Sequence, residues 1–365
     1  MTMTQPGPLR VRVVEVIRET ADAHSLVLEP ADGDHGRLGY RPGQFLTVRI
    51  PAGREGWTAR CYSLCSSPVR DEKLKVTVKR VAGGHGSNWI CDNVAEGDVL
   101  EVLRPSGTFT PRTLDGDLLL LAAGSGITPV MSILKSCLHA GSGSVALVYA
   151  NRDENSVIFR DELAALAREH AGRLTVIHWL ESVQGLPAAE TLAALAGPYA
   201  GREAFVCGPE PFMDRVAEAL AGLGVPSGRV HVERFTSLTG DPFAGPAPAA
   251  EDDRDDRSAG SAGSAGSAGD TAEPDGELEV ELYGERRTLP WPRGRRLLDV
   301  LLEAGLDAPF SCREGNCSAC ACVLLEGEVA LEANNVLDAR DLADGLILGC
   351  QAIPVSERVK VTYDA

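Results

Sequence analysis

The chain has 365 residues, of which 44% are hydrophobic, and its 52 Asp and Glu against 35 Lys and Arg give a formal net charge of −17. This length allows two or three domains, and the negative charge argues against a nucleic-acid-binding surface. The first residues lack the basic and apolar regions of a secretory signal peptide. The longest apolar run, residues 118–123, is too short to span a membrane. We therefore expect a cytoplasmic protein, which suits ten cysteines that show no disulfide framework.

Residues 8–113 have the pattern of a small antiparallel β-barrel. The segments 9–17, 44–50, 73–81 and 99–103 are short, rich in β-formers and separated by Gly and Pro. On one further strand, Arg60 and Tyr62 share a face and Ser63 lies on the other. A guanidinium suits a phosphate, and a Tyr ring suits a flat heterocycle. Taken alone, this pattern is more typical of an exposed strand with a packed Tyr.

A glycine cluster follows in the same predicted barrel. Gly83, Gly84 and Gly86 lead into Ser87 and a short helical pattern. Free N–H groups at a helix start, next to a hydroxyl, bind phosphate oxygens well. A flexible hairpin turn is the alternative for this segment in isolation. Together with Arg60, the cluster predicts a pyrophosphate site.

Residues 114–235 change to an alternation of strands and helices. Apolar strand patterns at 117–123, 145–150, 173–180 and 204–207 are separated by helical patterns at 129–138, 158–170, 188–195 and 209–223. This alternation predicts an α/β domain with a parallel, doubly wound sheet.

Two motifs stand at the predicted carboxyl edge of that sheet. Gly124, Gly126, Thr128 and Pro129 form a turn into a helix, with Pro129 expected at its first position. Such folds bind dinucleotides at this edge, although Pro129 prevents a match to G-x-G-x-x-G. The second motif, Cys207-Gly208-Pro209, ends the fourth strand. Cys207 is either a buried thiol that closes the strand or a contact for a nicotinamide ring.

The second strand ends in residues that bear on the choice of nicotinamide. Arg152 could pair with a 2′-phosphate, whereas Asp153 and Glu154 would repel it and could bind a free ribose hydroxyl. Two carboxylates against one guanidinium predict NADH rather than NADPH.

Residues 236–276 lose all periodicity. They contain the acidic stretch 251–256 and four Ser-Ala-Gly repeats from 258 to 269. Such a composition cannot form a core and predicts a flexible linker.

The last segment, 277–365, carries a cysteine motif on a predicted mixed sheet of an α+β, β-grasp-like domain. Cys312, Cys317 and Cys320 follow C-x4-C-x2-C, and Cys350 is remote, which is the spacing of plant-type [2Fe–2S] ligands. Small residues in the loop, Gly315, Ser318 and Ala319, would let backbone N–H groups approach the sulfurs. Zinc in a non-enzymatic interaction module is the alternative, but zinc modules usually show two short cysteine pairs. We expect Cys322 to be a buried residue and not a ligand.

In this order, the motifs resemble those of bacterial oxygenase reductases that fuse a ferredoxin–NADP reductase-like module to a C-terminal plant-type ferredoxin. Steroid 9α-hydroxylase reductases are the nearest members, and phenylacetyl-CoA epoxidase reductases have a similar layout. The resemblance implies that Arg60, Tyr62 and Ser63 hold FAD, while Gly84, Gly86 and Ser87 take its pyrophosphate. It places Gly124, Gly126, Thr128, Pro129, Arg152, Gly208 and Pro209 on the dinucleotide. Cys207 and Ser63 would lie at the hydride-transfer site, and residues 233–235, with Phe235, would close the flavin face.

The implied function is electron transfer from NADH through FAD and a [2Fe–2S] cluster to a terminal Rieske-type oxygenase acting on a steroid. An NADPH-dependent reductase for a di-iron epoxidase of an aromatic acyl-CoA is the alternative within the family. We further expect a monomer with no nucleic-acid or membrane partner.

Overall fold

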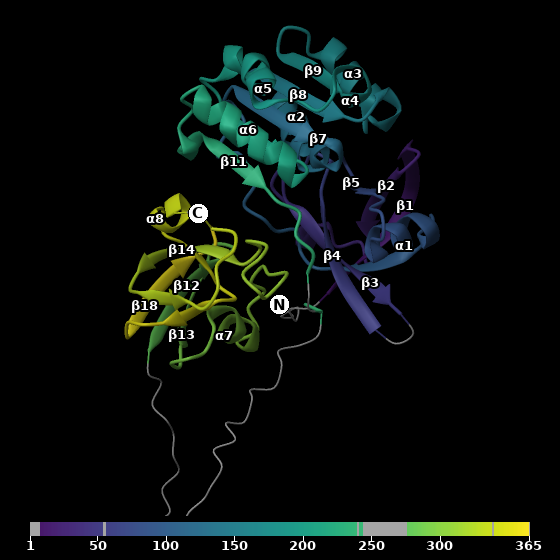
Figure 1. Cartoon of the computed structure of the whole chain (residues 1–365). Coiled ribbons are helices and arrows are strands. Elements are labelled where there is room, and N and C mark those ends of the chain that lie inside the picture. Colours follow the sequence, from purple (N-terminus) through teal and green to yellow (C-terminus); the bar gives the residue numbers. More distant parts are fainter. Residues whose placement is uncertain (1–7, 54–55, 239–240, 244–275, 338, 365) are drawn as a thin grey trace, which may run out of the picture.

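The structure is a computed structural model that describes residues 8–53, 56–238, 241–243, 276–337 and 339–364. Three folded units follow one another along the chain: a barrel in purple and blue, an α/β unit in teal and green, and a smaller unit in green and yellow (Figure 1). Most of the predicted linker, residues 244–275, lies outside the described residues. None of the helices in the described ranges combines the length and the apolar character that crossing a bilayer requires.

The first unit is the predicted antiparallel barrel. Its six strands take the order β4-β3-β6-β1-β2-β5, and a bridge between Leu64 and Val76 joins the end of β4 to β5. The elements are β1 (Leu9–Thr20), β2 (Ala23–Pro30), η1 (His35–Leu38), β3 (Phe45–Ala52), β4 (Gly56–Ser63), β5 (Leu74–Lys79), α1 (His85–Asn93) and β6 (Val99–Val102). Inward side chains such as Val11, Leu28 and Val48 are buried, as the core of a barrel requires.

The second unit is the predicted doubly wound sheet, with all five strands parallel in the order β11-β10-β7-β8-β9. Helices α2 and α3 cover one face, and α5 and α6 cover the other. The elements are β7 (Leu118–Ala123), η2 (Gly124–Gly126), α2 (Ile127–Ala140), β8 (Val145–Asn151), η3 (Glu154–Ser156), α3 (Arg160–Glu169), β9 (Leu174–Leu180), α4 (Glu181–Gln184), α5 (Ala189–Ala196), η4 (Gly197–Tyr199), β10 (Glu203–Cys207), α6 (Glu210–Gly222), η5 (Ser227–Arg229) and β11 (Val230–Glu233).

One local prediction in this unit was wrong. Helix α2 begins at Ile127, so Pro129 is its third residue and not its first. The helix tolerates this because the first N–H groups of a helix have no partner within it, and a proline there costs no hydrogen bond. The turn residues 124–126 form η2, which leads directly into the helix.

The third unit is a mixed sheet with the order β13-β12-β18-β14-β16, packed on α7 around the fully buried Trp291. Its first and last strands, β12 and β18, pair in parallel. The elements are β12 (Glu277–Leu282), β13 (Glu285–Pro290), α7 (Leu297–Glu303), β14 (Ala321–Glu326), β15 (Val329–Leu331), α8 (Ala339–Ala343), β16 (Leu346–Leu348), β17 (Ala352–Pro354) and β18 (Arg358–Thr362). This is the predicted β-grasp-like arrangement.

A buried ammonium group joins the barrel to the α/β unit. Lys135 of α2 is 2% exposed, and its Nζ lies 2.6 Å from Asp71 of the barrel and 3.1 Å from Glu162 of α3. Burial alone would raise the pKa of Glu162, but the charges of Lys135 and Lys75 outweigh it, and the pKa is lowered. The ion pairs of Glu162 therefore stabilise the fold above the ordinary carboxyl pKa, and this contribution is lost as the pH falls through the lowered pKa of Glu162.

We expect Lys135→Met to lower the free energy of unfolding at pH 7 by about 1–3 kcal/mol, because two partly exposed carboxylates lose their shared cation. The loss should shrink as the pH falls below the ordinary carboxyl pKa and through the lowered pKa of Glu162, since protonation of Glu162 removes the charge that Lys135 pairs with. Urea unfolding at pH 7 and at an acidic pH below the ordinary carboxyl pKa measures this change in the free energy of unfolding. Arg70→Met is the matched control, because it breaks an exposed pair (Arg70–Glu169, 3.0 Å) across the same two units. An equal loss in both variants would contradict the special role of Lys135.

Candidate functional site

The four predicted ligand cysteines come together between α7 and β14 and at the end of β16. Backbone N–H groups point at their sulfurs: those of Glu314 and Asn316 donate to Cys312 Sγ at 3.3 and 3.2 Å, and that of Cys350 to Cys320 Sγ at 3.4 Å. The N–H of Cys312 donates to Cys317 Sγ at 3.2 Å. Such donors stabilise negative charge on thiolates, as a cluster site needs.

The loop reaches this geometry through three residues with positive φ. Arg313, Gly315 and Ser318 have φ values of 58°, 76° and 52°. A Cβ at Gly315 would lie 3.0 Å from the carbonyl oxygen of Ala333, so this position combines a left-handed backbone with a close approach. Gly315 and Ser318 thus belong to the tight turn that the small residues predicted.

The spacing of the sulfurs bears on the zinc alternative. Within the described part of the chain, no three His, Cys, Asp or Glu side chains stand close enough to hold one metal ion. A single zinc needs all four sulfurs within about 2.3 Å of one point. Two irons divide the four thiolates between them and let the donors stand farther apart.

Strand β4 carries the predicted flavin motif next to the start of α1. A Cβ at Gly86 would lie 2.9 Å from Arg60 Cγ and 3.5 Å from the Tyr62 hydroxyl, so only glycine lets the helix start approach these side chains. Ser63 is buried at the end of β4, where it pairs with Phe45. The structure therefore brings the Arg60 motif and the glycine cluster together, as a phosphate site in the barrel requires.

The same region is closed by the chain that follows β11. Arg60 Nη1 donates to Thr58 Oγ1 (2.8 Å), to the Ala59 carbonyl (2.7 Å) and, at 3.4 Å, to the carbonyl of Leu238. Gly84 precedes α1 as its N-cap, and Ser87 Oγ accepts from the N–H of Val81 at 3.1 Å. The flavin motif on β4 is thus in contact with a segment that returns from the α/β unit.

The two motifs of the α/β unit meet at the carboxyl edge of the sheet. A Cβ at Gly126 would clash with the carbonyl oxygen of Cys207, so the first turn packs directly on the end of β10. Thr128 Oγ1 donates to the carbonyl of Ser125 at 3.0 Å and fixes the turn. Cys207 is fully buried, and Pro209 caps the start of α6.

A carboxyl group and an aromatic ring extend this edge toward the barrel. Glu233 pairs with Cys207 across β10 and β11, and burial raises the pKa of Glu233 to about 8. Burial, and next the charge of Glu233, raises the pKa of the Cys207 thiol. The same carboxyl group contributes to the raised pKa of Cys61 on β4, behind burial. Phe235, two residues later, is 51% exposed. Parts of both units therefore converge around residues 233–235.

A pocket of about 410 Å³ opens at the carboxyl ends of β7, β8 and β9, within the range of cofactor sites. Its lining comes from both the barrel and the α/β unit and consists of Lys79, Ala123, Gly124, Ala150, Asn151, Arg152, Trp179, Glu181, Leu186, Pro187, Pro209, Pro211, Phe212 and Arg215. The amide atoms of Asn151 are buried and have no hydrogen-bond partner among the described residues. An unsatisfied amide in a pocket of this size fits a polar ligand such as a dinucleotide.

The charges in this pocket differ from those expected from the sequence. Asp153 turns its carboxylate to the N–H groups of Asn155 and Ser156, both at 2.9 Å, as the cap of η3. Neither Asp153 nor Glu154 is among the lining residues, whereas Arg152 is, and it pairs with Asp22 at 2.9 Å. The carboxylate in the lining is Glu181, which follows β9. The carboxylate at the pocket therefore follows the neighbouring strand and not β8, where Asp153 and Glu154 stand.

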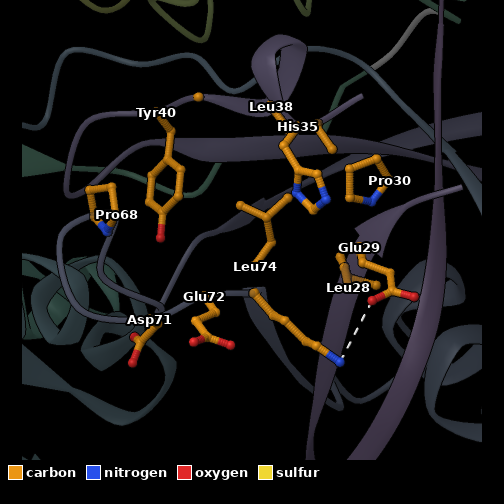
Figure 2. Close-up of a pocket in the computed structure, with 12 residues that line it drawn as sticks. Leu28, Glu29, Pro30, His35, Leu38, Tyr40, Pro68, Asp71, Glu72 and Leu74 are labelled. Carbon is orange, nitrogen blue, oxygen red and sulfur yellow. Dashed lines mark ion pairs between the residues drawn. The ribbon is translucent and has the colours of Figure 1, made fainter. Parts of the chain in front are cut away.

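A second hollow, of about 320 Å³, lies on the barrel between β2, η1 and the chain before β5 (Figure 2). Glu29, Asp71 and Glu72 contribute carboxylates to it, and Glu29 pairs with Lys73 at 3.6 Å. None of the predicted site residues lines it. We assign it no function.

Sequence reasoning missed Lys79, Asn151, Glu181 and Arg215, which line the pocket of about 410 Å³. Asn151 and Glu181 could have been found, because each stands at the carboxyl end of a predicted parallel strand. Lys79 comes from the barrel and Arg215 from within α6. Their presence depends on how the units pack, which no local pattern encodes.

Three family models match the chain in the predicted order. They are the oxidoreductase FAD-binding domain over residues 10–110, the oxidoreductase NAD-binding domain over 120–218 and the 2Fe-2S iron-sulfur cluster binding domain over 280–355. These matches confirm the predicted fold class and the predicted cofactors FAD, a nicotinamide dinucleotide and a [2Fe–2S] cluster.

Curated relatives match over nearly their whole length. The chain is 55% identical to the "3-ketosteroid-9-alpha-monooxygenase, ferredoxin reductase component" of Rhodococcus rhodochrous, over 96% of this chain and 95% of the relative. It is 32% identical to a component of the 1,2-phenylacetyl-CoA epoxidase of Escherichia coli, over 97% of each. Among solved structures, phthalate dioxygenase reductase superposes with a TM-score of 0.56 at 25% identity, over 98% of this chain and all of that one.

We expect Cys350→Ser to impair cluster assembly, because a remote ligand is lost while its backbone N–H remains. Cys322→Ser is the matched control: Cys322 is a neighbouring buried cysteine, 3% exposed, outside the predicted ligand set. Iron and acid-labile sulfide per chain measure the result. Equal loss in both variants would contradict the assignment of Cys350, and full iron in Cys350→Ser would do the same.

Proposed function

Because the chain belongs to the family of oxygenase reductase components that join FAD-binding, NAD-binding and 2Fe-2S domains, we propose that it is the reductase of a 3-ketosteroid 9α-monooxygenase. The observation that carries the proposal is the 55% identity to the Rhodococcus rhodochrous reductase component over almost the whole of both chains. The identity to the epoxidase component, 32%, is much lower. The proposed acceptor is a Rieske-type terminal oxygenase.

In this proposal, each folded unit binds a different cofactor. Bound FAD and a [2Fe–2S] cluster supply the conversion of an electron pair into single electrons. In this proposal, Arg60 and the start of α1 at Gly84, Gly86 and Ser87 hold the flavin phosphates, since a guanidinium and a helix N-terminus both favour phosphate. Tyr62 and Ser63 hold the flavin itself. Cys312, Cys317, Cys320 and Cys350 bind the cluster.

The proposed hydride-transfer site lies where the barrel and the α/β unit meet. Gly124, Gly126, Thr128, Pro129, Arg152, Gly208 and Pro209 bind the dinucleotide in and beside the pocket of about 410 Å³. Cys207 and Ser63 border the reacting rings from the two units. Phe235, whose ring is half-exposed, would close the flavin face and exclude water from it.

The proposal includes a monomer in the cytoplasm. None of the ten cysteines of the chain forms a disulfide in the structure, which suits a reducing compartment.

Reconstitution with the terminal oxygenase of a 3-ketosteroid 9α-monooxygenase tests the function. With NADH, oxygen and a 3-ketosteroid, the chain should support 9α-hydroxylation, and Cys350→Ser should not, although it should still reduce ferricyanide through the flavin. Product formation is followed by mass spectrometry. Support of a phenylacetyl-CoA epoxidase, with no turnover of the ketosteroid system, would overturn the proposal in favour of the alternative.

We also propose NADH as the electron donor, and Glu181 now supports this choice. Its carboxylate lines the pocket and would repel a 2′-phosphate, while Asp22 neutralises part of the positive charge of Lys79 and Arg152. Glu181→Gln should shift the NADH-to-NADPH ratio of kcat/KM toward NADPH by about tenfold, or about 1.4 kcal/mol. Glu154→Gln, an equal charge change on an exposed residue outside the lining, should leave the ratio unchanged. A preference of the wild-type chain for NADPH would overturn the proposal that NADH is the donor. A larger shift of the ratio in Glu154→Gln than in Glu181→Gln would overturn the role of Glu181.

A further inference from the structure

A buried amide lies against the proposed cluster ligands of the third unit, residues 277–364, which we call the [2Fe–2S] unit. Gln351 directly follows the proposed ligand Cys350 and is 3% exposed. Its Nε2 donates to Cys350 Sγ at 3.4 Å and to the carbonyl of Arg313 at 2.9 Å. Burying an amide is costly unless its N–H groups find partners, and this nitrogen has two.

The neighbouring backbone fixes the direction in which this amide points. The carbonyl of Arg313 can only accept, so the amide nitrogen, and not the amide oxygen, must face it. The main chain of Gln351 is held as well, because its N–H donates to the carbonyl of Leu348 at 2.9 Å. The cysteine loop confines the side chain, since a Cβ at Gly315 would lie 3.3 Å from Gln351 Cγ. The N–H group that points at Cys350 Sγ is therefore held in place by its surroundings.

A second polar group reaches the same ligands from the end of the chain. The pairing of β14 with β18 brings Tyr363 next to Cys322, and the Tyr363 hydroxyl is buried with no hydrogen-bond partner among the described residues. A Cβ at Gly349 would lie 2.7 Å from this hydroxyl and 3.1 Å from the carbonyl oxygen of Cys320. The hydroxyl thus occupies the space that a side chain at Gly349 would need, directly before Cys350. It stands between the backbones of two proposed ligands.

Donors at these positions matter because this part of the site is shielded from water. Cys320 and Cys350 are each 2% exposed and belong to the core of the unit. Reduction adds one negative charge to a cluster, and surroundings of low dielectric disfavour that charge. Hydrogen bonds to the sulfurs offset this effect, because they stabilise the reduced form more than the oxidised form.

We propose that Gln351 and Tyr363 raise the reduction potential of the [2Fe–2S] cluster by donating hydrogen bonds to its sulfurs. Gln351 acts through the thiolate of Cys350, and Tyr363 uses the hydroxyl that has no partner within the described chain. A phenol is a donor at neutral pH, as is an amide. A higher potential favours the passage of single electrons from the flavin to the cluster. This inference rests on the ligand set of the proposed function.

Two substitutions remove the donors and keep the shape of the site. Gln351→Met deletes the amide, and Tyr363→Phe deletes only the hydroxyl. At the potential that leaves half of the wild-type cluster reduced, the ratio of reduced to oxidised cluster should be about tenfold lower in each variant, which is a midpoint about 59 mV lower for a one-electron couple. A redox titration of the full chain, followed by electron paramagnetic resonance, measures this midpoint. Thr362→Val is the matched control, because it deletes a buried hydroxyl that accepts from the N–H of Asp364 at 3.1 Å, and it should leave the midpoint unchanged.

Iron and acid-labile sulfide show whether each variant holds a full cluster. An unchanged midpoint at full iron content in Gln351→Met or Tyr363→Phe would overturn the inference, and so would an equal shift in Thr362→Val. If Gln351→Met binds no iron, the wild-type chain decides. Gln351 is the one glutamine of residues 277–365, so glutamine labelled isotopically at the side-chain nitrogen should give a hyperfine coupling to the reduced cluster. Absence of that coupling would overturn the inference. The titration uses this chain alone, so a wild-type chain that fails to serve the ketosteroid oxygenase would reject the proposed function and not this inference.

Discussion

The arrangement of the barrel and the α/β unit depends on one buried ammonium group and its two ion pairs. Lys135 places its ammonium group between Asp71 of the barrel and Glu162 of α3, almost out of reach of water. Removing such a charge from water is favourable only when its partners are held in place. The two ion pairs of Lys135 therefore fix the parallel sheet against the barrel. They also fix the direction in which the carboxyl edge of the sheet points. That direction brings Lys79 of β5 into the pocket at this edge, which Gly124 and Arg152 also line.

A short stretch of chain then connects all three sites. Strand β11 ends at Glu233, whose partly buried carboxyl group contributes to the raised pKa of both Cys207 and Cys61. It continues to Leu238, whose carbonyl accepts from Arg60 and whose side chain packs near Cys312. The carboxyl edge of the parallel sheet, the strand with the predicted flavin motif and the cysteine loop thus all meet residues 233–238.

Local chemistry explains which parts of this architecture could be predicted. The spacing of the cysteine loop, its small residues and its backbone donors all lie within a few positions, so the loop is visible along the chain. The parallel sheet is visible too, because strand and helix patterns alternate strongly. The role of Asp153 could not be predicted, because a carboxylate at the end of a strand can either bind a ligand or accept hydrogen bonds from the N–H groups of the next turn. In this structure Asp153 accepts from the turn. The contact of Thr47 with Ser311 joins positions 264 residues apart, and no pattern along the chain indicates it. Strand β11 was not predicted either, because it has only four residues and depends on its pairing with β10.

The pairing of β12 with β18 has a consequence for how this protein can be rebuilt. Because the first and last strands of the [2Fe–2S] unit are neighbours in one sheet and enclose their own core around Trp291, the unit closes on itself. A domain with its own hydrophobic core can fold on its own, and a new host would have to replace the contacts that the cysteine loop makes with the barrel. The unit is therefore a portable module that a protein engineer could graft onto another flavoprotein, or onto an oxygenase directly, to shorten a multi-protein chain of electron carriers.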